Sequence, residues 1–237
     1  MKPKDITTHI DPSSPFVAAV DMGSNTCRLT LSKVVGDQLE TVDTFSRVVR
    51  LAENVTSKGN LSTQAMERAT AALQVVANKI KAAKPSRIRA VATEACRRAD
   101  NRVFFQKFVY EQTGIDLEII DAHEEARLSL VGCQPMFDHS KSHVIVFDIG
   151  GGSTEVILAD ITDPHAPKVL NAISLDFGVV GLAEKYGSYC SMVFGDIEQA
   201  IVKALDGFGK DLNLQEMVQN NHEPHFAVLQ LGQQALQ

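Results

Sequence analysis

The sequence predicts an α/β protein made of two similar domains. The main observation is a duplication: an apolar strand, an acid and a turn rich in Gly, Ser and Thr occur twice. The first copy, residues 21–26 (DMGSNT), follows the apolar run 16–20, and the second, residues 148–154 (DIGGGST), follows the run 144–147. The length of 237 residues suits two small domains.

The first domain is expected over residues 16–121. In its first helix, apolar residues recur at spacings of three and four and give one buried face. Ser62 is expected to cap this helix and Pro85 to stop it, while Gly36-Asp37 supplies a turn between two strands. The expected strands are 16–21, 28–35, 38–45, 88–92 and 117–120, and the expected helices are 62–83 and 101–112.

The second domain, residues 122–237, repeats this order after a helix at 123–132. Its expected elements are strands at 143–148, 155–159 and 168–174, a helix at 195–208 and a strand at 225–231. The sequence ends there, so this domain is expected to lack its closing helix and last strand. Residues 1–15 are polar and lack an apolar signal core, which predicts a disordered N-terminal tail.

Composition excludes several classes of partner. The net charge of −6 gives no global basic field for nucleic acid or an anionic membrane surface. No apolar stretch approaches the length of a membrane span. Four scattered cysteines without a C-x-x-C pair argue against zinc and for reduced thiols, so a cytoplasmic protein is expected.

The two turns point to phosphate binding. Without a Cβ, a Gly-rich turn lets backbone N–H groups approach a phosphate closely, and an acid at a strand end can hold a hydrated cation or a water. A single turn of this kind could equally be a tight hairpin, but the duplication favours two turns that face each other across a cleft. The expected phosphate donors are the backbone amides of Ser24, Asn25, Thr26, Gly150, Gly151, Gly152 and Ser153.

Five sequence blocks, in this order, resemble the exopolyphosphatase / guanosine pentaphosphate phosphohydrolase (Ppx/GppA) family. They are DMGSNTCR (21–28), SRVVRL (46–51), ATEACRRADN (92–101), EEARL (124–128) and DIGGGSTE (148–155). The resemblance covers about residues 16–184. It implies the fold of the actin, Hsp70 and sugar-kinase group, in which two ribonuclease-H-like domains face a phosphate cleft. It also implies a Mg²⁺-dependent hydrolase that releases terminal phosphate from inorganic polyphosphate or guanosine pentaphosphate.

The resemblance also assigns roles to single residues. Glu125 aligns with the catalytic glutamate that precedes Ala-Arg, and Arg97 with a phosphate-binding arginine. Asp148 and Glu155 are the expected Mg²⁺ pair, with Asp21 contributing from the first domain. The structural alternatives are a solvated acid at a helix N-terminus for Glu125 and turn-capping acids for the other three.

The sequence departs from the family pattern in three places. Ala122-His123 replaces the usual Ser-Gly pair before the glutamates, and Gly181 stands where family members commonly have an arginine. The chain also stops soon after residue 231, before a further phosphate turn and helices. Apolar surface left uncovered in the second domain would favour a homodimer. An alternative function is an impaired relative that binds guanosine alarmones or polyphosphate as a sensor. A kinase of the same fold group would need an Asp base instead of the EEAR block.

Overall fold

The computed structural model describes residues 10–53, 55–175, 178–179, 199, 202, 206 and 225–229. The chain divides into two compact units between Asp121 and Ala122, and each unit is described by itself. Among the described residues, no helix is both long and apolar enough to cross a membrane.

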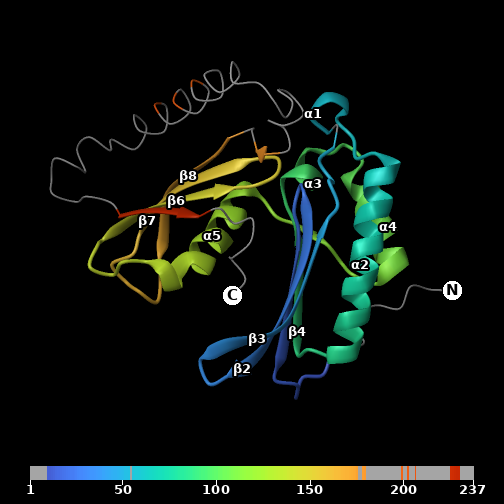
Figure 1. The fold of residues 1–237 in the computed structure, drawn as a ribbon, viewed down its shortest axis with the longest axis horizontal. Helices are drawn as coiled ribbons and strands as arrows, with labels where there is room; N and C mark the ends of the chain where they lie inside the picture. Colours follow the sequence, from blue (N-terminus) through green and yellow to red (C-terminus); the bar gives the residue numbers. More distant parts are fainter. Residues whose placement is uncertain are drawn as a thin grey trace. The chain divides into compact units, whose positions relative to one another are not determined.

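The first unit contains a five-stranded sheet in the order β3-β2-β1-β4-β5 (Figure 1). The pairs β1–β2 and β2–β3 are antiparallel, whereas β1–β4 and β4–β5 are parallel. This is the ribonuclease-H-like order that the sequence predicted. The strands are β1 (Phe16–Met22), β2 (Thr26–Val35), β3 (Gln38–Val48), β4 (Arg87–Ala92) and β5 (Glu118–Ile119).

The longest helix of this unit, α2 (Thr63–Ala83), begins and ends as the sequence predicted. Ser62 adopts an extended backbone and its side chain accepts a hydrogen bond from the Ala65 amide, so it is the N-cap. Lys84 closes the helix in the left-handed conformation, directly before Pro85. The other helices are α1 (Val55–Lys58), α3 (Glu94–Arg98) and α4 (Arg102–Thr113), the last closed by Gly114.

The core of the first unit lies between one face of the sheet and the helices α2 and α4 (Figure 1). Alternate residues of β1, namely Ala18, Val20 and Met22, are buried on this face. The same alternation places Asp21 on the opposite face, at the end of the strand. Residues 10–15 are held to the unit by backbone hydrogen bonds from Asp11 to Pro85 and from Val34 to Pro15.

The second unit repeats the sheet pattern in four strands, in the order β8-β7-β6-β9. Here β9 is parallel to β6, as β4 is to β1 in the first unit. Helix α5 (Ala122–Cys133) packs on β7 and β8 (Figure 1). A 3₁₀ turn, Gln134–Met136, follows α5. The strands are β6 (His143–Ile149), β7 (Thr154–Asp160), β8 (Lys168–Leu175) and β9 (His225–Leu229).

Most predicted elements are confirmed with ends shifted by one to three residues. Two short helices were not predicted, α1 and α3, because four or five residues show no apolar periodicity. The predicted strand 225–231 is present as β9. The predicted helix 195–208 lies outside the described residues except at three positions, and so does the predicted tail over residues 1–9.

Candidate functional site

The two duplicated turns close with the same hydrogen bond. The Gly23 amide donates to the Thr26 carbonyl at 3.0 Å, and the Gly150 amide donates to the Ser153 carbonyl at 2.9 Å. A Cβ at either glycine would lie 3.1–3.3 Å from that acceptor oxygen, closer than side chains normally approach. Glycine at the first position therefore avoids a tight contact in both turns, which explains part of the duplicated pattern.

The turn of the first unit is anchored by the loop that follows β3. The Asn25 carbonyl accepts from the amides of Val49 and Arg50, and the Ser24 carbonyl accepts from Ala52 at 2.9 Å. Because a trans peptide points its C=O and the next N–H in opposite directions, the amides of Asn25 and Thr26 point away from this loop. That orientation is the one that phosphate donors on the open side of the turn require.

Arg68 of α2 in turn holds the anchoring loop. Its guanidinium donates to the carbonyl of Val49 at 2.9 Å and to that of Arg50 at 3.3 Å, and forms an ion pair with Glu53. Arg50 itself has a positive φ of 48°, a rare backbone conformation for a residue other than glycine. The loop that holds the turn is therefore itself held in place by Arg68 of the long helix α2.

Asp21 lies two residues before the turn and opposite Arg28 in the β1–β2 register. Burial raises the pKa of Asp21 to about 6, and the positive charge of Arg28 opposes that rise without cancelling it. The carboxylate and the guanidinium occupy the same face of the sheet, because directly opposed residues of an antiparallel pair point to the same side.

Asp148 occupies the equivalent position in the second unit, and its opposed residue is an acid, Glu155. The Ser129 hydroxyl of α5 donates to Asp148 Oδ2 at 2.7 Å, and the Ser174 hydroxyl of β8 donates to Glu155 Oε1 at 2.9 Å. Glu155 is only 2% exposed. Two acids predicted from sequence are therefore side by side on one sheet face, each oriented by a serine.

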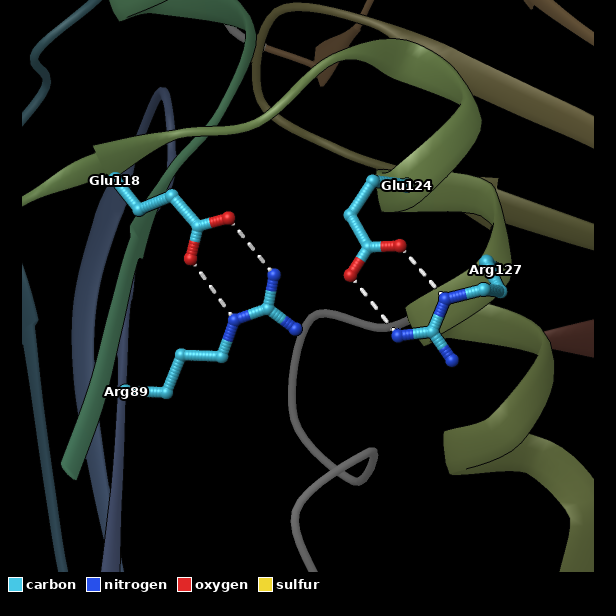
Figure 2. A network of polar contacts seen from close by, with 4 residues as sticks. All are labelled: Arg89, Glu118, Glu124 and Arg127. Atoms are coloured by element: carbon cyan, nitrogen blue, oxygen red, sulfur yellow. Dashed lines mark hydrogen bonds and ion pairs between the residues drawn. The ribbon is translucent and has the colours of Figure 1, made fainter. Parts of the chain in front are cut away.

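Glu125 lies on the face of α5 that carries Ser129, one helical turn away. Its neighbour Glu124 is engaged elsewhere: Arg127 binds the Glu124 carboxylate in a bidentate pair, with Nε–Oε2 and Nη2–Oε1 distances of 2.6 and 2.9 Å (Figure 2). Only Glu125 of the two acids shares a helix face with the serine that contacts Asp148. The role of Glu125 as a base stays a prediction.

Arg97 lies in α3, and its Nη1 donates to the Ile120 carbonyl at 3.1 Å, just after β5. This bond holds the guanidinium beside the carboxyl ends of the parallel strands, where α/β sheets commonly bind ligands. The short strand β5 is also fixed to β4 by a bidentate pair between Arg89 and Glu118, with both distances at 3.0 Å (Figure 2). Phosphate binding by Arg97 stays a prediction.

The cysteines near these motifs are unsuited to nucleophilic chemistry. Cys27, Cys96 and Cys133 are buried and free, and burial raises the pKa of each thiol to about 12. They pack as small apolar residues in the cores of the two units.

Three polar residues were missed from the sequence: Glu94, which accepts a hydrogen bond from Ser24, and the serines Ser129 and Ser174. For Glu94, the only indication of a role in the sequence is its position inside a motif block. The sequence gives no indication of a role for the two serines, because the register of the sheet and the packing of α5 determine their partners. No group of three or more His, Cys, Asp or Glu residues suited to a metal occurs in the described part of the chain.

A family model of the Ppx/GppA phosphatase family matches residues 30–206. The chain belongs to this family. A curated relative, guanosine-5'-triphosphate,3'-diphosphate pyrophosphatase of Photobacterium profundum, is 33% identical over 176 residues, which are 74% of this chain and 34% of the relative. The chain therefore spans about a third of the length of that relative.

Solved structures of Ppx/GppA proteins share the fold. An exopolyphosphatase-like protein is 30% identical, with a TM-score of 0.71 over 82% of this chain and 60% of its own. The type II variant of the Aquifex aeolicus Ppx/GppA phosphatase is 32% identical, with a TM-score of 0.59 over 72% of this chain and 55% of its own. The α/β fold predicted from the duplicated pattern is thus confirmed.

Proposed function

We propose that the chain is a Mg²⁺-dependent hydrolase that releases the terminal phosphate of inorganic polyphosphate or of guanosine pentaphosphate. The observation that carries this proposal is the acid pair Asp148 and Glu155, placed directly before and after a Gly-rich turn, with Glu125 on the adjacent helix face. Membership of the Ppx/GppA phosphatase family and the name of the curated relative support the same chemistry.

Asp148 and Glu155 are the residues that would hold Mg²⁺. Two neighbouring carboxylates suit this cation, which accepts few protein ligands and completes its shell with waters and phosphate oxygens. When bound, Mg²⁺ would neutralise negative charge on the phosphates. Asp21, predicted as a further ligand, is a weaker candidate because Arg28 stands opposite it, where the acid pair has a second carboxylate.

The chain's own residues supply the other parts of the reaction. Glu125 accepts a proton from a water whose oxygen attacks the terminal phosphorus, while the bond from phosphorus to the bridging oxygen breaks and its electrons leave with the shortened substrate. Backbone amides of each Gly-rich turn are suited to donate to phosphate oxygens. Arg97 adds a charged donor beside the turn of its own unit.

The test is phosphate release by the full chain with Mg²⁺ from polyphosphate and, separately, from guanosine pentaphosphate. Glu125→Gln should lower kcat by roughly 10²–10⁴-fold, the usual contribution of a positioned base. Glu124→Gln is the matched control, since it makes the same change one residue away on an acid bound by Arg127. It should stay within about threefold of the parent.

Equal loss in both variants, or full activity in Glu125→Gln, would contradict the assignment of the base. Tight binding of either anion without any release would favour the sensor alternative. Comparison of the two substrates under one set of conditions decides which anion the site prefers.

A further inference from the structure

Glu94 is a buried acid with two partners. It is the first residue of α3 and is 6% exposed. Its Oε2 accepts a hydrogen bond from the Ser24 hydroxyl at 2.7 Å, and its Oε1 pairs with Arg98 Nη1 at 3.0 Å. A buried carboxylate is tolerated when both oxygens have such partners, and removal of one partner is costly.

The hydroxyl of Ser24 is fully committed to this contact. Its single proton goes to Glu94, and its oxygen accepts a hydrogen bond from the Ala95 amide at 3.2 Å. The side chain of Ser24 therefore has no proton left for a bound phosphate, and Ser24 can contribute only its backbone amide. The hydroxyl instead ties the turn of the first unit to the N-terminus of α3.

The same short helix carries Arg97, so α3 connects two predicted phosphate ligands. A helix of five residues has little stability of its own and keeps its position through tertiary contacts. Three contacts hold its start near the turn: the Thr93 amide donates to the Met22 carbonyl at 3.2 Å, and Ser24 binds both Glu94 and the Ala95 amide. At its other end, Arg97 reaches the Ile120 carbonyl.

We propose that Glu94 is a positioning residue that fixes the 23–26 turn relative to Arg97, so that backbone amides and guanidinium reach the same phosphate. The proposal rests on the proposed function only for the identity of the anion. Because Glu94 acts through Ser24, it should affect the binding of phosphate more than the rate of the chemical step.

The test uses the full chain and four variants: Glu94→Ala, Glu94→Gln, Ser24→Ala and the double variant Ser24→Ala/Glu94→Ala. Calorimetry with inorganic tripolyphosphate gives the Kd, and phosphate release gives KM and kcat. Glu94→Ala and Ser24→Ala should each weaken binding about tenfold, the loss of one hydrogen bond to a charged group, with kcat within about threefold. The double variant should lose less affinity than the sum of the two single losses, because both single variants remove the hydrogen bond between Ser24 and Glu94.

Glu94→Gln is the conservative rescue. Its amide oxygen still accepts from Ser24, so binding should stay within about threefold of the parent despite the weaker pairing with Arg98. Additive losses in the double variant, parental binding in Glu94→Ala, or a loss in kcat with an unchanged Kd would each overturn the proposal. If Glu94→Ala does not fold, Ser24→Ala and Glu94→Gln still compare binding without and with the hydrogen bond between residues 24 and 94.

A readout free of ligand separates this proposal from the function on which it rests. In ¹⁵N spectra without any anion, Glu94→Ala and Ser24→Ala should shift the amides of residues 24–26 and the Nε of Arg97 together. Shifts confined to residues 94–98 in Glu94→Ala would show that the turn does not depend on Glu94. Coupled shifts in a chain that binds no tripolyphosphate would keep the positioning role and reject the phosphate function.

Discussion

The two duplicated turns close with the same hydrogen bond but differ in the charge beside them. Gly23 and Gly150 make equivalent closing hydrogen bonds, and Asp21 and Asp148 precede them at equal distances in sequence. The difference lies seven residues after each acid, at the position opposed to it in the sheet, which is Arg28 in one unit and Glu155 in the other. One register position thus decides the charge beside each turn.

This difference indicates that the two copies of the turn are suited to bind different charges. In the second unit, two adjacent carboxylates, each oriented by a serine, concentrate negative charge that a cation would neutralise. In the first unit, the guanidinium of Arg28 offsets part of the cost of burying Asp21, and the buried Glu94 accepts a hydrogen bond from Ser24 of the turn. The first turn is therefore suited to an anion, and the second to a cation together with its anion.

The largest expected effect comes from removing one charge of the acid pair. Glu155→Gln keeps the shape of the side chain and its contact with Ser174, but should lower Mg²⁺-dependent phosphate release by about 10³-fold, as losses of catalytic electrostatics do. Phosphate release over a Mg²⁺ titration measures it. Glu40→Gln on the exposed strand β3 is the control, and a similar loss there would point to a global effect.

The next largest effect is on the free energy of unfolding, which depends on pH through the cost of ionising Asp21. Its pKa in the folded state, about 6, is raised above the ordinary 3.8, so the folded chain binds this proton more tightly than the unfolded chain. The resulting stability is complete below pH 3.8 and is lost as the pH rises through 6, by up to about 3 kcal/mol.

Asp21→Asn should remove that slope and raise the free energy of unfolding at pH 8. Urea unfolding with EDTA present, at several values from pH 4 to pH 8, measures both chains. A parent chain whose stability stays level from pH 4 to pH 7 would contradict the raised pKa of Asp21.

A smaller effect should follow from Arg28→Gln. Because the charge of Arg28 lowers the pKa of Asp21, its removal should move that pKa above 6. Carbon-13 NMR titration of the Asp21 carboxyl, with EDTA present, measures the change. An unchanged titration would mean that the register partner does not set the electrostatics of the first turn.

The smallest effect concerns the serines of the second unit. Ser129→Ala removes the donor to Asp148 and should lower the free energy of unfolding by about 1 kcal/mol, with Mg²⁺ activation shifted to higher concentration. Ser140→Ala, on an exposed loop of the same unit, should change neither quantity. Unchanged Mg²⁺ activation in Ser129→Ala would show that this serine does not orient the acid.

The sequence predicted the fold well because the features that indicate the fold depend on residues close together in the chain. Strand alternation and the capping of α2 by Ser62 depend on nearby residues, and so does the close contact that glycine avoids at Gly23 and Gly150. The opposition of Asp148 and Glu155 across a hairpin also follows from short spacing. All of these features were therefore within reach of the sequence.

What the sequence could not supply depends on distant packing. The contact between Ser24 and Glu94 joins residues 70 positions apart, and Ser129 reaches Asp148 only because α5 packs on the sheet. The raised pKa of Asp21 likewise comes from burial, which depends on tertiary packing. The face-to-face placement of the two turns and the roles of Glu125 and Arg97 stay predictions.

The most direct test is calorimetric titration of the chain with Mg²⁺ alone, repeated for Glu155→Gln, Asp148→Asn and Asp21→Asn. The account predicts that binding is lost in the two variants of the second unit and retained within about threefold in Asp21→Asn, since only one turn has an acid pair. Equal loss in Asp21→Asn, or Mg²⁺ binding that survives in Glu155→Gln, would contradict it.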